Sequence, residues 1–267
     1  MTNIIWVIGE TGFIGSHIAS ALKTNYESSL IFGSRRPSKL KLVSSVQKLD
    51  IRVYDYAECL LIYGQPTHIF YAAGSGTVQE TSKNVENSID GNIKMLNKIL
   101  DIAKDFDRKC YISLISTAAV SSLGIEQRGD TLYAIHKKMA EDLLNYYMLQ
   151  DHVNGAIFRP FSVFGKGLKK QIFYDWAVEL STHNKSEHLM RGSGKELREY
   201  IEVSDCIDLI IKSSMLEVKS DIPIELGCGS PITIKSVADI FCDVWFELYS
   251  ERKHIGFKKD YGSGPID

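Results

Sequence analysis

Near its start the chain reads Ile4-Ile5-Trp6-Val7-Ile8-Gly9-Glu10-Thr11-Gly12-Phe13-Ile14-Gly15. The apolar run that opens this stretch is too short for a helix and is typical of a parallel strand buried on both faces. After the glycines, Ile14, Ile18 and Leu22 recur at helical spacing, which predicts a helix that lies on the sheet. The glycines therefore fall on a turn between a strand and a helix.

Each glycine in this turn has a steric reason. Gly9 allows a tight turn, Gly12 allows backbone N–H groups to approach a pyrophosphate, and Gly15 allows the helix to pack against the sheet. The N-terminus of the helix then faces the phosphates. The alternative, a turn that binds nothing, is disfavoured because a strand precedes the glycines and a helix follows them. We therefore predict a dinucleotide site with contacts at Gly9, Thr11, Gly12, Phe13, Ile14 and Gly15.

The second predicted strand, Leu30-Ile31-Phe32, ends where the adenosine ribose of such a cofactor lies. An acidic residue at this position selects NAD by bonding the 2′-hydroxyl. The chain instead has Ser34-Arg35-Arg36, which offers no carboxylate and two guanidinium groups suited to a 2′-phosphate. We therefore expect NADP(H) to be favoured over NAD(H). The alternative is that Arg35 and Arg36 are solvated loop charges.

The composition is that of a soluble globular protein. The chain has 267 residues, of which 44% are hydrophobic, and a net charge of −2. This near balance argues against a nucleic-acid partner. The five cysteines are widely spaced and show no paired metal-ligand spacing, so we expect a reducing, cytoplasmic setting and no metal. No apolar run approaches the ~18 residues of a membrane span and no targeting segment precedes the first strand, so we expect no membrane anchor.

Apolar runs and helical stretches alternate through the first part of the chain, which predicts an α/β protein with a doubly wound parallel sheet, the Rossmann fold. Further strands are predicted near residues 51–54, 68–71, 111–115 and 155–158, and helices over 89–103 and 131–147. Beyond residue 160 the alternation becomes irregular, with helices near 171–180 and 234–248. We expect a dinucleotide-binding domain over residues 1–160 and a smaller substrate-binding lobe over residues 161–267, with some of its segments returning to the sheet.

Ligands of such sheets lie at the carboxyl ends of the strands, and the strand at 111–115 ends beside Ser116-Thr117. The helix that follows carries Tyr133 and Lys137 one turn apart, hence on one face. A nearby ammonium lowers the pKa of a tyrosine, which is ordinarily near ~10, because it favours the phenolate. We therefore predict hydride transfer between a nicotinamide and a carbinol carbon. In this reaction Tyr133 moves the proton, Lys137 holds the phenol and the nicotinamide ribose, and Thr117 bonds the reacting oxygen.

The same Tyr-x-x-x-Lys spacing recurs at Tyr249 and Lys253. This second pair follows an amphipathic helix, and no strand that ends in hydroxyl residues precedes it. We therefore interpret Tyr249 and Lys253 as structural residues. An ordinary pair on a helix is also the alternative for Tyr133 and Lys137, and the glycine turn and Ser116-Thr117 disfavour it there.

Together these motifs resemble those of the extended short-chain dehydrogenases/reductases, in particular the NAD-dependent epimerase/dehydratase family, whose members act mainly on nucleotide sugars. The resemblance extends over nearly the whole chain. It is also carried by Asp55-Tyr56, Tyr71-Ala72-Ala73-Gly74, Ser88-Ile89-Asp90-Gly91-Asn92, Arg159-Pro160-Phe161-Ser162 and the stretch 194–205.

The resemblance implies a role for several of these residues. The implied cofactor contacts are Asp55 and Tyr56 at the adenine, the wall formed by Tyr71, Ala72 and Ala73, and in addition Ser88, Pro160 and Phe161. The implied substrate contacts are Ser75, Ser116, Ser162 and Arg198. Ser162 stands where the family has an asparagine that touches the substrate. Arg198 corresponds to the arginine that grips the substrate diphosphate, with a surface salt bridge as the alternative.

One departure from the family narrows the reaction. Family members that dehydrate a sugar across C5–C6 carry an Asp-Glu pair after the active-site threonine, whereas this chain has Ala118-Ala119. Dehydration is therefore not expected. The resemblance implies an NADPH-dependent reductase of a nucleotide-linked 4-keto-6-deoxy sugar, with a nucleotide-sugar 4-epimerase as the alternative. A non-catalytic NADP-binding regulatory protein is a third interpretation, which the residues Thr117, Tyr133 and Lys137 disfavour. Family analogy also implies a homodimer formed through the helices that follow the strands at 68–71 and 111–115.

Overall fold

The computed structural model describes residues 3–25, 29–33, 46–49, 60, 64–74, 78–124, 131–182 and 185–258. Contacts within the chain divide it into two compact units. The first unit comprises Met1–Phe161 and Glu202–Leu226, and the second comprises Ser162–Ile201 and Gly227–Asp267. The segment 202–226 therefore returns to the first unit after the chain has entered the second.

The first unit is built on a parallel sheet, which in the described residues has seven strands in the order β11-β6-β5-β4-β1-β2-β3. The strands are β1 (Ile4–Ile8), β2 (Ser29–Gly33), β3 (Val46–Leu49), β4 (His68–Tyr71), β5 (Tyr111–Ile115), β6 (Asn154–Pro160) and β11 (Ile224–Leu226). Ile5 of β1 pairs with Leu30 on one side and His68 on the other, so β1 is central. The predicted doubly wound α/β fold is confirmed, while the strand predicted near 51–54 lies outside the described residues.

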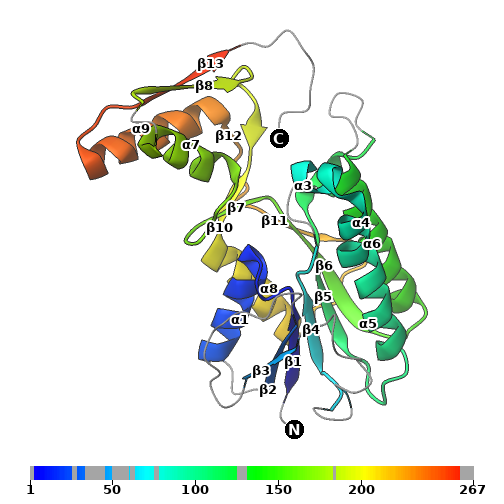
Figure 1. The fold of residues 1–267 in the computed structure, drawn as a ribbon. Helices are drawn as coiled ribbons and strands as arrows, with labels where there is room; N and C mark the ends of the chain where they lie inside the picture. The colour runs from blue at the N-terminus through cyan, green and yellow to red at the C-terminus, as the bar shows by residue number, and fades with distance from the viewer. Residues whose placement is uncertain are drawn as a thin grey trace. The chain divides into compact units, whose positions relative to one another are not determined.

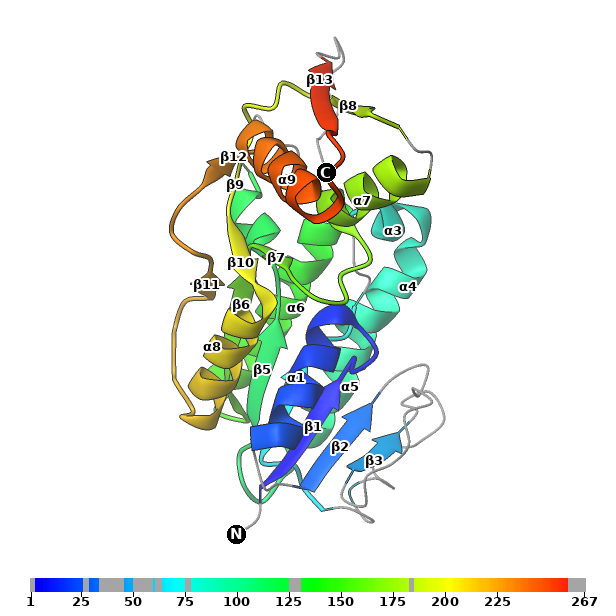
Figure 2. The ribbon, with the colours of Figure 1, turned by 90° about the vertical axis from the view of Figure 1, so that its left-hand side faces the viewer.

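Helices cover both faces of this sheet (Figures 1 and 2). On one face α1 (Phe13–Asn25) packs beside α8 (Val203–Met215). On the other face α6 packs against α3, α4 and α5. The helices of this face are α3 (Val78–Lys83), α4 (Val85–Ile89), α5 (Met95–Ala103) and α6 (Leu132–Leu149). The helix predicted over 89–103 is interrupted by a π-helical turn, η1 (Asp90–Lys94), which joins α4 to α5.

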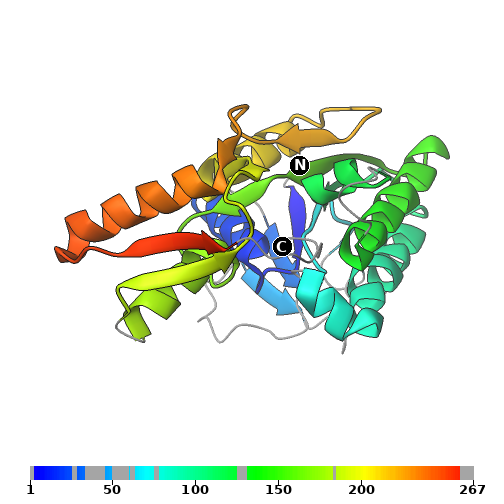
Figure 3. The same ribbon diagram turned by 90° about the horizontal axis from the view of Figure 1, so that it is seen from above.

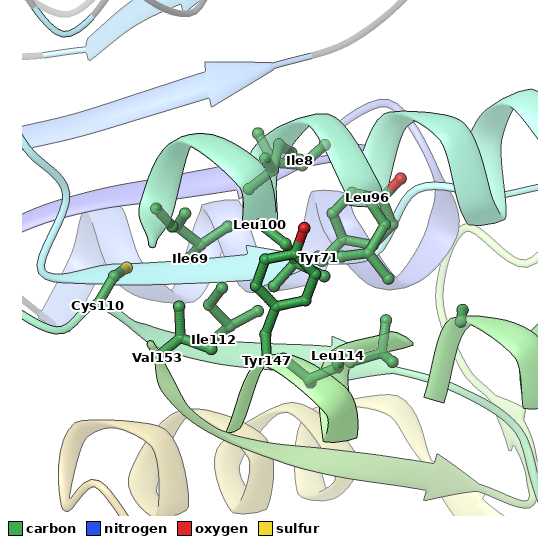
Figure 4. Packing of buried hydrophobic residues seen from close by; sticks show 14 of the residues in the cluster. Ile8, Ile69, Tyr71, Leu96, Leu100, Cys110, Ile112, Leu114, Tyr147 and Val153 are labelled. Carbon is green, nitrogen blue, oxygen red and sulfur yellow. The ribbon is translucent and has the colours of Figure 1, made fainter. Parts of the chain in front are cut away.

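The main core lies between the sheet and the helices α5 and α6 (Figure 4). Alternate residues of β1, β4 and β5 enter it, because successive side chains of a strand point to opposite faces. From β4 and β5 these residues are Ile69, Tyr71, Ile112 and Leu114, and α5 adds Leu96 and Leu100, among others. Burying a side chain of this size contributes roughly 1.5–3 kcal/mol. The core therefore fixes the strand ends relative to α6.

The second unit has its own apolar cluster around Trp176, Leu180 and Val237. Its elements are α7 (Gln171–Thr182), α9 (Ile234–Tyr249), β7 (Ser162–Phe164), β8 (Glu187–Arg191), β9 (Leu197–Arg198), β10 (Tyr200–Glu202), β12 (Ile232–Thr233) and β13 (His254–Lys258). The strands pair as β7 with β10, β9 with β12, and β8 with β13. Figure 3 shows α9 running alongside the β8–β13 pair. None of the helices in the described ranges combines the length and apolarity that a membrane-spanning segment needs.

Candidate active site

The turn after β1 requires glycine at two positions. Gly9 has φ +94, and a Cβ there would lie 2.7 Å from the backbone of Ala72 and Ala73, just beyond β4. A Cβ on Gly15 would lie 2.1 Å from the Gly9 carbonyl oxygen, so α1 could not start at its present position. Gly12 differs, because among the described atoms its Cβ would meet only the Gly9 carbonyl oxygen, at 3.3 Å. The turn therefore depends on Gly9 and Gly15 for its shape and leaves the backbone of Gly12 open.

This turn presents the N-terminus of α1 at the carboxyl edge of the sheet. The first turn of α1 contains no acidic residue, so nothing on it offsets the partial positive charge of a helix N-terminus. Thr11 and Gly12 are exposed, and Phe13 and Ile14 are half-buried. These features suit the binding of a phosphate group. The predicted contacts Ser34, Arg35, Arg36, Asp55, Tyr56 and Ser75 lie outside the described residues.

Three predicted catalytic residues come together where β5 ends. Thr117 caps the short 3-10 helix η2 (Ala118–Ser122), and its side chain hydrogen-bonds the phenol of Tyr133. Thr131 caps the N-terminus of α6 by accepting a hydrogen bond from the Ala134 N–H at 3.2 Å, which fixes Tyr133 in the first turn of that helix. One turn later, Lys137 Nζ donates to the carbonyl oxygen of Ile115 at 3.0 Å.

Burial acts on both ionisable side chains of this group. It lowers the pKa of Lys137 to about 8, and the negative charge of Glu141 opposes that change. Burial also raises the pKa of Tyr133, against the hydrogen bond with Thr117, which lowers it. The expectation that Lys137 lowers the pKa of Tyr133 is therefore wrong. The reason is that desolvation of the phenol outweighs the other influences, and the ammonium is directed to a backbone carbonyl.

The structure adds an ion pair that the sequence analysis did not identify. Glu141, four residues beyond Lys137, is 1% exposed and accepts two hydrogen bonds from Arg159 of β6, from Nε at 2.9 Å and from Nη2 at 2.6 Å. The hydroxyl of Ser116 also donates to this carboxylate. A sequence signal existed, since Tyr133, Lys137 and Glu141 recur every four residues on the side of α6 that faces the sheet.

The π-helical turn η1 places a second polar group near Lys137. Asn92 is buried, and its Nδ2 donates to the carbonyl oxygen and hydroxyl of Ser88 at 3.0 and 3.1 Å. The Ser88 hydroxyl also contacts Nδ1 of His136 at 2.8 Å. A Cβ on Gly74 would lie 2.4 Å from Asn92 Oδ1 and 3.2 Å from Lys137 Nζ, so both atoms converge on this glycine. Within the described residues, Asn92 Oδ1 has no hydrogen-bond partner.

The remaining predicted contacts divide between the two units. Tyr71, Ala72 and Ala73 lie at the end of β4, and the Tyr71 hydroxyl donates to the Gly91 carbonyl oxygen. Pro160 ends β6, and the N–H of Phe161 donates to the Leu226 carbonyl oxygen at 2.9 Å. Ser162 and Arg198 belong to the second unit, on β7 and β9.

The second Tyr-x-x-x-Lys pair has only structural partners in the described ranges. Tyr249 is 59% exposed at the end of α9, and its ring lies 4.8 Å from that of Trp245. Lys253 donates to the carbonyl oxygen of Lys185 at 2.9 Å and pairs with Glu251. These contacts support the structural interpretation of the pair.

The fold and this cluster at the strand ends agree with comparisons to known proteins. Residues 5–221 match the model of the NAD dependent epimerase/dehydratase family, and the chain belongs to this family of enzymes. A UDP-N-acetyl-alpha-D-glucosaminuronate decarboxylase of Bacillus cytotoxicus is 25% identical over 279 residues, which cover 97% of this chain and 85% of the relative. UDP-glucuronate 4-epimerase 6 of Arabidopsis thaliana is 24% identical over 229 residues, which cover 76% of this chain and 49% of the relative. The chain thus spans about half the length of that plant relative.

Solved structures show the same fold. UDP-glucuronic acid 4-epimerase from Bacillus cereus, in complex with UDP-glucuronic acid and NAD, has a TM-score of 0.78 and 21% identity, covering 98% of this chain and 88% of that one. MoeE5 in complex with UDP-glucose and NAD also has a TM-score of 0.78, with 17% identity and coverage of 98% and 87%.

These comparisons overturn the predicted preference for NADP(H). The matching family is NAD dependent, and the solved relatives hold NAD. The prediction was wrong because two guanidinium groups near a ribose do not by themselves make a 2′-phosphate site. Two guanidinium groups bind a phosphate only if they converge on it, and Arg35 and Arg36 lie outside the residues that the structure describes.

Proposed function

We propose that this protein is an NAD-dependent epimerase that inverts the C4 hydroxyl of a UDP-linked sugar. The observation that carries the proposal is the group formed by Thr117, Tyr133 and Lys137 at the end of β5. Relatives named as 4-epimerases of UDP-sugars support this reaction over the reduction of a keto sugar, so the alternative of the sequence analysis becomes the main proposal.

The residues present fit NAD. The open backbone at Gly12 and the N-terminus of α1 form a cradle for the pyrophosphate. Asn92 Oδ1 and Lys137 Nζ provide a buried acceptor and a donor that converge on Gly74, as binding of a ribose requires. In this proposal Tyr71, Ala72, Ala73, Ser88, Pro160 and Phe161 complete the pocket.

The protein's own residues manage the proton. Tyr133, as phenolate, accepts the proton of the C4 hydroxyl while the sugar is oxidised, and it returns this proton when the 4-keto group is reduced. Thr117 donates a hydrogen bond to the phenol oxygen or to the sugar oxygen and so keeps the two aligned. Because the pKa of Lys137 is about 8, this side chain is mostly an ammonium at pH 7, and in this proposal it donates a hydrogen bond to the ribose of the nicotinamide nucleotide.

When bound, oxidised NAD supplies a positively charged nicotinamide that accepts a hydride from C4 and returns it. Inversion requires that the 4-keto sugar turn before it is reduced, so that its other face receives the hydrogen. Ala118 and Ala119, directly after Thr117, bring no acid or base that could eliminate water across C5–C6. The site thereby favours return of the hydrogen to C4 over dehydration.

The substrate contacts and the assembly are part of the same proposal. In this proposal the substrate contacts are Ser116, Ser162 and Arg198, with Arg198 binding the diphosphate of the nucleotide sugar. A homodimer is supported by apolar side chains that α6 leaves exposed at helical spacing. These residues are Leu132, Ile135, Met139, Tyr146 and Leu149.

The experiment that tests this function is a panel of UDP-sugars monitored by proton NMR. Purified protein with NAD is incubated separately with UDP-glucose, UDP-glucuronic acid and UDP-N-acetylglucosamine, and each reaction is also run from the C4 epimer. We expect one pair to reach the same mixture from both directions. Release of carbon dioxide, or stoichiometric formation of NADH, would assign another reaction.

A further inference from the structure

Helix α6 faces the end of β5 with three polar side chains spaced four residues apart. Each of them bonds a different residue of the segment 115–117. The pairs are Tyr133 with Thr117, Lys137 with Ile115, and Glu141 with Ser116. The first two side chains have roles in the proposed chemistry, whereas the third has none.

Glu141 is held in one geometry. Burying a carboxylate is unfavourable unless its charge is paired and its oxygens are hydrogen-bonded. Arg159 of β6 supplies this pairing in a bidentate arrangement, Nε to Oε1 and Nη2 to Oε2, and Oε1 also accepts the Ser116 hydroxyl. The partners come from β6 and from the segment after β5, so this carboxylate joins α6 to two strands.

Arg159 extends the connection beyond Thr117. Its Nη1 donates to the hydroxyl of Ser121, in η2, at 3.1 Å, and it lies 4.0 Å from Glu225 of β11. The turn that carries Thr117 is therefore held on both sides, by Glu141 at Ser116 and by Arg159 at Ser121.

Within the described residues, three elements present groups to Lys137. On its own helix these are the carboxylate of Glu141 and the neutral phenol of Tyr133. From β6 the charged group is Arg159, which Glu141 already engages, and from η1 the facing side chain is the neutral amide of Asn92. Glu141 is the group whose negative charge raises the pKa of Lys137 against the effect of burial.

We propose that Glu141, balanced by Arg159, is a positioning residue of the active site. It fixes Ser116, and through it the neighbouring Thr117, in line with Tyr133, and it keeps a negative charge near the Lys137 ammonium. The inference rests on the proposed function only through the roles of Tyr133 and Lys137, and it does not depend on which sugar is bound.

The test compares Glu141→Gln, the double variant Glu141→Gln with Arg159→Gln, and Asp142→Asn. The double variant removes both charges and so avoids a buried, unpaired guanidinium, which destabilises a folded protein. Asp142→Asn is the matched control, because Asp142 is the next residue on α6 and pairs with Lys138 at the surface. Two quantities are measured, namely kcat and KM with the UDP-sugar that the wild type converts, and the pKa of Lys137 from the NMR shift of its ¹⁵N-labelled ammonium, assigned with Lys137→Met.

We expect kcat to fall by about 10²-fold in the single and the double variant, with KM changed by less than about threefold, as for a misplaced but intact site. We expect the pKa of Lys137 to fall by about one unit in Glu141→Gln, since a neighbouring opposite charge is lost. Asp142→Asn should match the wild type in both measurements. Wild-type kcat in the double variant would overturn the proposal, because the pair would then serve folding alone. If the wild type converts no UDP-sugar, the proposed function fails, and the titration of Lys137 decides the positioning inference: an unchanged pKa in Glu141→Gln overturns it.

Discussion

The ammonium of Lys137 donates a hydrogen bond to the carbonyl oxygen of Ile115 at 3.0 Å, and this bond ties the helix that carries Tyr133 to the last residue of β5. The contact places a buried cation at the carboxyl edge of the sheet, where ligands of this fold bind. It also explains why burial lowers the pKa of Lys137: in exchange for water, the described residues offer this ammonium the carbonyl oxygen of Ile115 and the negative charge of Glu141.

Replacing Tyr133 with phenylalanine should remove the proton carrier and little else. We expect kcat to fall by about 10²–10⁴-fold while the affinity for NAD, measured by calorimetry, stays within a few-fold. Tyr249→Phe is the matched control, since it has the same spacing to a lysine and an exposed ring. If Tyr133→Phe is active and Tyr249→Phe is inactive, the proton carrier is Tyr249 and the role given to Tyr133 is wrong.

The buried lysine should make stability depend on pH. In the unfolded chain a lysine has a pKa near ~10.4, whereas Lys137 in the folded protein has a pKa of about 8. Between these values the unfolded state binds more protons, so the free energy of unfolding rises with pH. The variant Lys137→Met has no ionisable group at this position, so its free energy of unfolding lacks this pH dependence. We therefore expect the variant to be more stable than the wild type at pH 7. We expect this difference in unfolding free energy to shrink by up to about 3 kcal/mol by pH 10.

Urea unfolding of both proteins at pH 7 and pH 10 measures this difference. The comparison cancels the titration of the other groups that the two proteins share. A difference in unfolding free energy that does not change with pH would show that Lys137 keeps the ordinary pKa of a lysine when folded.

Alanine substitutions at two glycines of the turn after β1 should have different effects, one on stability and one on NAD affinity. Gly15→Ala places a methyl group 2.1 Å from a backbone oxygen, so we expect a clear loss of thermal stability. Gly12→Ala meets only one described atom, at 3.3 Å, so it should fold with nearly unchanged stability and yet bind NAD at least tenfold more weakly. Calorimetric melting and NAD titration of both variants separate these effects. Wild-type NAD affinity in Gly12→Ala would remove this turn from the cofactor site.

The central sheet could be predicted from the sequence because its strands are continuous apolar runs, as in β1 and β5. The strands of the second unit could not, since an element of two residues such as β9 carries no periodicity. Glu141 escaped prediction for a related reason. A carboxylate on a helix is usually exposed, and only its partner Arg159, which is distant in the sequence, accounts for its burial. The error about NADP(H) came from a local pattern, Arg35-Arg36, whose meaning depends on convergence in space.

The most direct test of the central claim uses the UDP-sugar identified by the panel, labelled with deuterium at C4. The protein is incubated with it and NAD, and the product is analysed by mass spectrometry and NMR while absorbance at 340 nm is recorded. The account predicts that the C4 epimer forms with deuterium still at C4 and with no net NADH, because hydrogen leaves and returns to the same carbon within one site. An inverted product that has lost its deuterium, or NADH that accumulates in proportion to the sugar consumed, would contradict it.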